Sequence, residues 1–304
     1  MATISVRDLA TLTDGLTPAL LASDGDRLVP TGVDGFGVVR STARSILRAT
    51  LYHPVICLIL QGAKELELGA QRVECAAGQS IVVSHELPLR SRITDASPEV
   101  PYLALILELD VGLLRRLVDD IDGLDVREPA DPDPTALRVG GAAPALIDAF
   151  GRLLSMVDSP VEASALGPLV VHEIHFRLLA ADHGAALRRL LNRDSHASRI
   201  AKAIDQIRGD LAEPLAIGDL ARAVGMSQSS FHEHFKAVTS TTPLQYQKDL
   251  RLLEARQLLG LGDRTVTEVA LAVGYQSPTQ FSREYSRKFG ITPSEDRDRI
   301  VRVA

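Results

Sequence analysis

The sequence predicts an α+β chain of two domains, with antiparallel strands in the N-terminal half and only helices in the C-terminal half. Two observations support this fold class. Short apolar runs separated by glycine and proline fill residues 36–109, and helical periodicity dominates from residue 110 onward. In addition, residues 217–293 contain one short pattern written twice. At 304 residues the chain is long enough for two domains of ordinary size.

Four segments in the first half have the composition of strands. Each is short, apolar or alternating, and each is bounded by turn residues such as Gly62, Gly69 and Gly78. The segments are Val55–Leu60, Glu65–Leu68, Gln79–Val83 and Tyr102–Leu109. They recur about every ten residues with no helix-length segment between them, which favours a small antiparallel barrel or sandwich over a parallel sheet.

Helices are predicted where apolar residues recur at positions i, i+3 and i+4. These segments are Val6–Thr13, Val111–Val118, Pro144–Met156, Leu166–Ala180 and Ala185–Leu191. The three prolines of Glu128–Pro134 predict a loop. The polar segment 192–198 is the best candidate for a linker. We therefore expect one domain over residues 1–191, with its barrel at about 36–109 and its helices at about 110–191, and a second over 199–299.

Each copy of the repeated pattern predicts a helix, a tight turn and a second helix. In the second copy, at about 265–289, Thr265 and Glu268 are spaced as a capping box. Gly274 is placed to end the first helix, because glycine readily adopts the left-handed conformation of a helix C-terminus. Ser277 and Pro278 then begin the next helix as N-cap and first helical residue. This is the pattern of a helix-turn-helix unit.

The first copy, at about 217–239, follows the same plan with a weaker start. Ala216 stands where the second copy has its threonine cap, which removes a cap worth about 1 kcal/mol. Gly225 supplies the turn and Ser227 the N-cap of the second helix. Phe231 and Phe235, four residues apart, should face the core.

A long helix at about 243–260 is expected to connect the two units. About 17 residues at 1.5 Å each give a length of roughly 25 Å. With the widths of the flanking helices added, the two exposed helices can lie about 34 Å apart, which is one turn of DNA. The sequence therefore predicts two reading helices that enter successive major grooves.

Polar and cationic side chains are left on the exposed faces of these two helices. Arg283, Arg287, Lys288 and Lys236 are expected to contact phosphates or guanine. Finer base reading is expected from smaller polar groups, although Glu233 would repel phosphates and could only accept from cytosine N4. The full set of candidate DNA-binding residues is Ser227, Gln228, Ser229, His232, Glu233, Lys236, Ser277, Thr279, Gln280, Arg283, Arg287 and Lys288.

These segments carry a family resemblance. Three segments resemble the DNA-binding domain of the AraC/XylS transcription regulators. They are LARAVGMS in the first copy, LRLLEARQLL in the connecting helix and VTEVALAVGYQSPTQFSREYSRKFGITPSEDR in the second copy. The segments Pro54–Lys64, Gly78–Pro88 and Pro101–Leu105 are similar to the effector domain of one subgroup of that family. The resemblance implies a cupin-like β-barrel that senses a small molecule and alters transcription, often as a dimer.

The same resemblance assigns base reading to particular positions. In the first unit they are Ser229, His232 and Glu233, and in the second unit they are Thr279, Gln280 and Arg283. The chain departs from the family at two positions: many relatives have arginine at the position of Glu233 and glycine at the position of Ser240. The second unit is therefore expected to contribute more affinity than the first.

The charge and composition of the chain limit the kinds of partner and compartment that are expected. The net charge is −6, and residues 196–304 carry 15 Lys+Arg against 13 Asp+Glu, whereas the rest carries 18 against 26. Charge alone supports DNA binding only weakly. No apolar run reaches the length of a membrane span and no secretion signal is recognisable, and the two cysteines form no disulfide framework. We expect a cytoplasmic homodimer that binds double-stranded DNA and an unknown small-molecule effector and that contacts RNA polymerase. We expect it to bind no cofactor, metal or membrane.

Two other classes of function stay open on the sequence. One is a metal-dependent cupin-type enzyme with an accessory helical domain. His172 and His175 are spaced i, i+3 and not i, i+4, and His85-Glu86 together with His53 fall short of a cupin metal set. A structural role is favoured for these histidines, as it is for Cys57 and Cys75, which could otherwise form a redox-sensing or aldehyde-sensing pair. The other class is an interaction module whose helix-turn-helix units bind protein.

Overall fold

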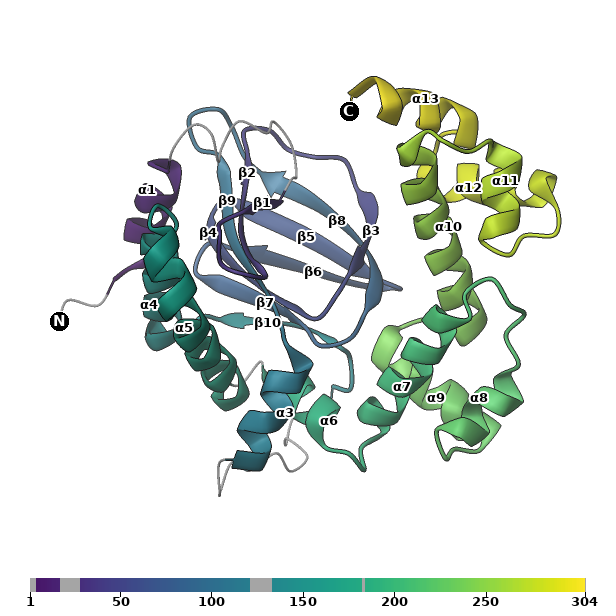
Figure 1. Cartoon of the computed structure of the whole chain (residues 1–304), viewed down its shortest axis with the longest axis horizontal. Helices are drawn as coiled ribbons and strands as arrows, with labels where there is room; N and C mark the ends of the chain where they lie inside the picture. The colour runs from purple at the N-terminus through teal and green to yellow at the C-terminus, as the bar shows by residue number, and fades with distance from the viewer. Residues whose placement is uncertain (1–3, 17–27, 121–132, 182–183, 304) are drawn as a thin grey trace.

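A computed structural model describes residues 4–16, 28–120, 133–181 and 184–303 (Figure 1). Its strands form two antiparallel sheets, as the sequence predicts. The six-stranded sheet has the order β1 (Leu28–Pro30), β2 (Phe36–Ser41), β9 (Tyr102–Glu108), β4 (Val55–Gln61), β7 (Gln79–Val83) and β10 (Leu137–Gly141). The four-stranded sheet has the order β3 (Arg48–Tyr52), β8 (Leu87–Asp95), β5 (Ala63–Leu68) and β6 (Gln71–Ala76). We refer to the two sheets together as the barrel.

Strand β4 shows how the barrel is held together. Successive side chains of a strand point to opposite faces. Cys57 and Ile59 pack between the two sheets in one cluster with Leu66 of β5. Ile56 and Leu58 point to the opposite face, where they join a second cluster that contains the helices. Because β4 is buried on both faces, its sequence is a continuous apolar run.

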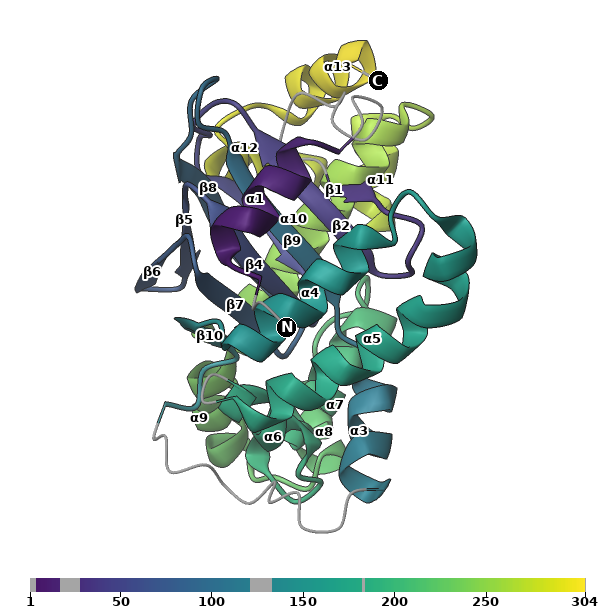
Figure 2. The same cartoon turned by 90° about the vertical axis from the view of Figure 1, so that its left-hand side faces the viewer.

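Helices cover the outer face of the six-stranded sheet (Figure 2). Phe36 of β2 packs against Phe150 of α4, with 6.2 Å between their ring centroids. The helices of this half are α1 (Val6–Asp14), α3 (Val111–Asp120), α4 (Pro144–Ser155), α5 (Pro160–Ala180) and α6 (Ala185–Leu191). Their existence confirms the helical periodicity of the sequence.

Two elements in this half differ from expectation. Helix α5 begins before the predicted Leu166, because Pro160 occupies the first helical turn, where its missing N–H costs nothing. Strand β10 lies beyond the predicted barrel range of 36–109 and pairs with β7. Most of the predicted loop 128–134 lies outside the described residues.

The C-terminal half consists of helices over the described range. They are α7 (His196–Gly209), α8 (Ile217–Ala223), α9 (Gln228–Thr239), α10 (Pro243–Leu261), α11 (Val266–Ala272), α12 (Pro278–Phe289) and α13 (Pro293–Val303). Helix α7 begins inside the predicted linker because the Ser195 hydroxyl caps it by accepting from the Ser198 amide at 3.0 Å. In the parts of the chain that the structure describes, no helix combines the length and apolar character that a membrane crossing requires.

Candidate nucleic-acid interface

The first helix-turn-helix unit consists of α8 and α9. Gly225 in the turn between them has φ +68°, and the Ser227 hydroxyl caps α9 by accepting from the Ser230 amide at 3.2 Å. Phe231 and Phe235 are fully buried, with ring centroids 5.6 Å apart. No side chain caps α8, because its N-cap residue is Ala216. The predicted unit and its missing cap are both confirmed.

The second unit consists of α11 and α12 and has every predicted cap. Thr265 and Glu268 form a reciprocal capping box: the Glu268 amide donates to the threonine hydroxyl at 3.2 Å, and the Thr265 amide donates to the carboxylate at 2.8 Å. The Ser277 hydroxyl accepts from the Gln280 amide at 3.3 Å, and Pro278 is the first residue of α12. Gly274, at φ +87°, forms the turn. Both helices of this unit are therefore capped at their N-termini by side chains of the chain itself.

Helices α9 and α12 expose the polar faces that the sequence predicts. Within the candidate set, Ser277 and Lys288 are half-buried and the others are exposed. The exposed residues of α9 and its cap are Ser227, Gln228, Ser229, His232, Glu233 and Lys236, and those of α12 are Thr279, Gln280, Arg283 and Arg287. Each helix thus brings its candidates together on one side of its unit. The Ser227 and Ser277 hydroxyls are already used as caps, so their groups are held close to the backbone.

Acidic side chains that sequence reasoning missed neutralise two lysines near α12. The Lys288 ammonium pairs with Asp249 of α10 at 2.5 Å, and Lys248 pairs with Glu284 at 2.9 Å. Glu284 also accepts from the Gln280 side chain at 3.2 Å. These ion pairs join residues 36 and 39 positions apart, so no local pattern indicates them. No ion pair to a described residue involves Arg283, which leaves this guanidinium available on the exposed face.

The C-terminal end of α9 touches the barrel. Ser240 ends the helix at φ +57° and is the one non-glycine residue with positive φ in the described ranges. This conformation costs about 1 kcal/mol for a residue with a side chain, which is why glycine is the usual residue at such a helix end. The turn at Gly69 is in close contact with Ser240, and the Ala136 amide donates to the Val238 carbonyl at 3.1 Å.

Glu86, between β7 and β8, joins the barrel to the two helices that flank the first unit, α7 and α10. Its side chain is only 8% exposed. Its Oε2 accepts from Nη1 of Arg208 on α7 at 2.8 Å, and its backbone carbonyl accepts from the Tyr246 hydroxyl of α10 at 2.8 Å. The core follows the same route: a single apolar cluster contains barrel residues such as Ile81 as well as Phe231 of the first unit. The second unit has a separate core.

His85, next to Glu86, makes this contact sensitive to pH. Its Nε2 donates to the Ala197 carbonyl at 3.0 Å, and its Nδ1 lies 2.8 Å from the Ser84 hydroxyl. Burial lowers the pKa of His85 from 6.5 to about 4. The folded chain therefore holds His85 neutral, whereas an unfolded chain protonates it below pH 6.5. The contribution of neutral His85 to the free energy of unfolding is complete above pH 6.5 and is lost as the pH falls toward 4.

We expect the free energy of unfolding to fall by about 2 kcal/mol from this group between pH 7.5 and pH 5.0. Urea unfolding at the two pH values measures the loss in the wild type and in His85→Gln, which should lack this component. His172→Gln removes an exposed histidine and is the matched control. An identical pH dependence in wild type and His85→Gln would contradict the assignment.

Three of the side chains that left an enzyme or a sensor open on the sequence, His175, Cys57 and Cys75, are buried in the structure. Nε2 of His175 accepts from the Asp110 amide at 3.0 Å, so its Nδ1 donates to the Val171 carbonyl at 2.8 Å, and both ring nitrogens are occupied. Cys57 and Cys75 are buried free thiols, and burial raises the pKa of Cys75 to about 12. Among the described residues, no group of three or more His, Cys, Asp or Glu side chains is arranged to hold a metal ion.

Known proteins resemble both halves of the chain. Residues 32–186 match the family of the AraC-type transcriptional regulator N-terminus, and residues 220–299 match a helix-turn-helix domain family. The probable thc operon regulatory protein of Rhodococcus erythropolis is 32% identical over 244 residues, which cover 76% of this chain and 72% of that protein. The crystal structure of ToxT from Vibrio cholerae has a TM-score of 0.58 at 14% identity and covers 88% of this chain and 100% of ToxT.

Other relatives match over a shorter part. The transcriptional regulator ArgR of Pseudomonas aeruginosa is 28% identical over 157 residues, which cover 44% of this chain and 48% of ArgR. The virulence regulon transcriptional activator VirF of Yersinia enterocolitica is 29% identical over 175 residues, or 56% of this chain and 62% of VirF. The chain thus spans about half to three-fifths of these two relatives. Together with the family match over residues 32–186, the comparisons lead to one conclusion: the chain belongs to the AraC-type family of transcriptional regulators.

Proposed function

We propose that the chain is a sequence-specific DNA-binding regulator of transcription, controlled by a small molecule that binds in the barrel. The observation that carries the proposal is the pair of exposed polar helices, α9 and α12, joined by one connector. Helix α10 has 19 residues and is therefore about 28 Å long. A connector of this length suits two reading helices in successive major grooves.

The proposed contacts differ between the two units. Arg283 and Arg287 on α12 are the cations best placed for guanine or phosphate, because both are exposed. Lys236 is the corresponding cation of α9, whereas Lys288 is held by Asp249 and must leave that ion pair to reach a phosphate. Base reading is proposed for the uncharged polar side chains of both helices and for Glu233. These are Gln228, Ser229 and His232 on α9, and Thr279 and Gln280 on α12, with Ser227 and Ser277 at the N-terminal caps.

Replacing Arg283 with alanine tests the assignment. If its guanidinium bonds to guanine in a bidentate manner, operator affinity should fall by about 1–3 kcal/mol and specificity at that base pair should relax. Fluorescence anisotropy with a duplex selected by the wild-type chain measures both effects. Arg116→Ala, which removes an exposed arginine on α3, is the matched control and should bind as the wild type does. Unchanged affinity in Arg283→Ala would remove Arg283 from the reading set.

The contacts between the barrel and the first unit support control by an effector. The barrel and α9 share one apolar cluster, so a molecule that changes packing between the sheets also changes the surroundings of Phe231. ToxT, which shares the fold, has been solved with a bound unsaturated fatty acid. We propose that a small molecule in the barrel shifts the population of DNA-binding orientations of α9. RNA polymerase is the further partner that activation of transcription requires.

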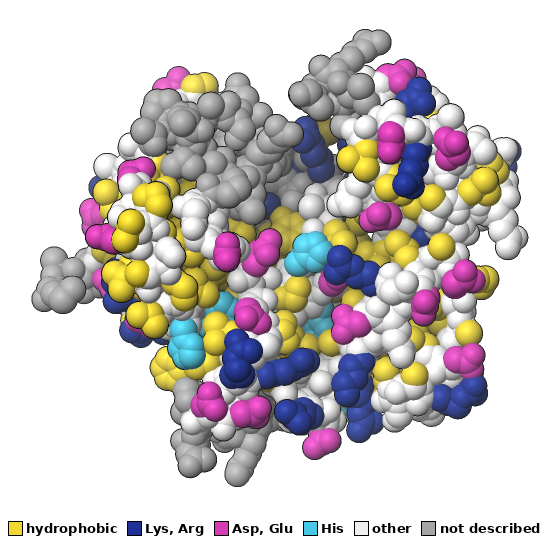
Figure 3. All heavy atoms as spheres, viewed as in Figure 1, with side chains coloured by type: hydrophobic (Ala, Val, Ile, Leu, Met, Phe, Trp, Pro, Cys, Tyr) yellow, Lys and Arg dark blue, Asp and Glu magenta, His cyan; other side chains and the backbone are white. Residues whose placement is uncertain are grey.

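Helix α5 is the proposed dimer contact. Its exposed apolar side chains include Val161, 80% exposed, and Leu169, 66% exposed, with Leu166 and Phe176 on the same helix. Figure 3 shows hydrophobic side chains gathering over the side of the molecule where α4 and α5 lie. Such a patch is typical of an interaction site. We expect Leu169→Glu to sediment as a monomer at concentrations where the wild type is a dimer, and a monomeric wild type would contradict this contact.

A further inference from the structure

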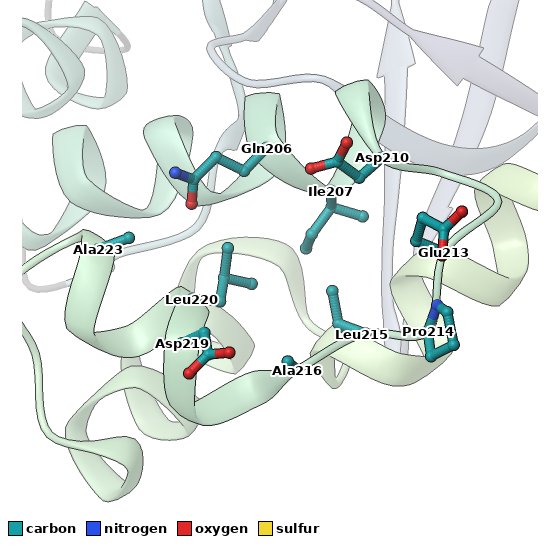
Figure 4. Close-up of a pocket in the computed structure, with 10 residues that line it drawn as sticks. All are labelled: Gln206, Ile207, Asp210, Glu213, Pro214, Leu215, Ala216, Asp219, Leu220 and Ala223. Carbon is teal, nitrogen blue, oxygen red and sulfur yellow. The ribbon is translucent and has the colours of Figure 1, made fainter.

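The loop at residues 210–216 packs against the first unit. It connects α7 to α8 and lines a groove of about 330 Å³ between them. In this groove the side chain of Leu215 points toward Ile207 of α7 and Leu220 of α8 (Figure 4). Leu215 also packs against the apolar cluster that contains Ile207, Leu220 and Phe231 of α9, which holds the loop against the first unit.

The same loop also touches the turn of the second unit. A Cβ atom added to Gly274 would lie 2.3 Å from the Ala212 carbonyl oxygen and 2.7 Å from the Ala212 Cα. No side chain fits in this space, so the two backbones are in direct contact. A rotation of one unit relative to the other must open this contact.

Arg251, in the middle of α10, bonds to both sides of the contact. Its Nε donates to the Leu211 carbonyl at 2.8 Å and its Nη2 to the Glu213 carbonyl at 2.9 Å, both in the loop. Its Nη1 donates to the Gly274 carbonyl at 3.2 Å, in the turn of the second unit. The guanidinium is a planar fork with five donors, so these three bonds constrain the loop and the turn in one plane.

Gln247, one turn earlier on α10, strengthens the loop side of the joint. Its Nε2 donates to the Leu211 carbonyl at 3.2 Å and to the Glu213 carbonyl at 2.8 Å, and its side chain is only 5% exposed. The joint also borders the reading face. A crevice of about 660 Å³ beside it is lined by Arg251 and by Gln280 of α12. The joint therefore lies beside the second reading helix.

We infer that Arg251 is a positioning residue for DNA recognition. By joining the loop of the first unit to the turn of the second, it sets the angle and separation between α9 and α12. It thereby determines the spacing between the two DNA segments that the chain accepts. One inserted base pair rotates a segment by about 34° around the duplex, which rigidly held helices cannot follow. This inference rests on the proposed function, because it assumes that both helices read DNA.

The test compares spacing preference in the wild type and in Arg251→Met, a variant of similar length without the fork. The probes are a duplex selected by the full-length wild-type chain from random sequences and derivatives with one or two base pairs inserted between its two contacted segments. We expect one insertion to weaken wild-type binding at least about 30-fold, and binding of Arg251→Met by no more than about 5-fold. Arg251→Lys keeps the charge but lacks the fork and should resemble Arg251→Met.

Arg256→Met is the matched control. Arg256 lies on the same helix but pairs with Asp296 of α13 at 2.9 Å and not with the loop or the turn, so its loss should leave the spacing preference unchanged. Gln247→Met removes two of the five bonds and should relax the spacing preference in part. It replaces Arg251→Met in the test if circular dichroism shows that Arg251→Met is unfolded. The inference would be overturned if the Arg251 and Gln247 variants bound every duplex more weakly but showed the same insertion penalty as the wild type. A wild-type chain that binds no duplex would overturn the proposed function and this inference with it.

Discussion

Replacing Phe281 with alanine should lower the free energy of unfolding of the second helix-turn-helix unit by about 3–5 kcal/mol. The side chain is fully buried, and its ring lies 5.3 Å from that of Tyr275 and 5.5 Å from that of Tyr285. The core of this unit comprises nine buried residues in the described ranges, so few neighbours can move in to fill the cavity. DNA binding should be lost together with the fold of α12.

Hydrogen exchange measures this prediction best, because it reports opening of the second unit separately from the rest. Amides of α11 and α12 should lose protection in Phe281→Ala, while those of β4 and β9 keep theirs. Leu271→Ala is the matched control, since Leu271 lies in the same unit but is 56% exposed. Equal loss of protection in the barrel would show that the second unit lacks the separate core described above.

The affinity for operator DNA should fall about 10³-fold between 50 and 200 mM salt if the two units together contact six phosphates. The net charge of −6 cannot supply this dependence, so it must come from local cations such as Arg287 and Lys236. A gel shift on the selected duplex at several salt concentrations gives the slope. Lys236→Gln should reduce the slope by about one. A slope near zero would favour the interaction-module alternative.

Local chemistry explains why the second unit could be predicted almost completely. The capping box of Thr265 and Glu268 and the Ser277-Pro278 start depend on residues at most three positions apart. Both were confirmed, as was the absence of a cap at Ala216. The prediction of a linker over the polar segment 192–198 was wrong in part, because α7 begins inside it. Polar composition is typical of a linker, but Ser195 in it is the N-cap of α7.

Long-range pairing explains what the sequence could not predict. The ion pair of Lys288 with Asp249 and the bonds of Arg251 to the loop and turn join residues 23 to 40 positions apart. Nothing in the periodicity of α10 distinguishes Arg251 from an exposed arginine. Strand β10 was missed because it is short and lies between helices, so only its pairing with β7 identifies it as part of the barrel. The division into domains at 191 and 199, and the individual reading residues, stay predictions.

The most direct test of the account is a hydroxyl-radical footprint of the wild-type chain on its selected duplex. The account predicts two protected segments on one face of the DNA, about 10 base pairs apart, one for α9 and one for α12. Arg283→Ala should weaken protection of the α12 segment first. A single protected segment, or two segments on opposite faces of the duplex, would contradict reading by two helices held on one rigid connector.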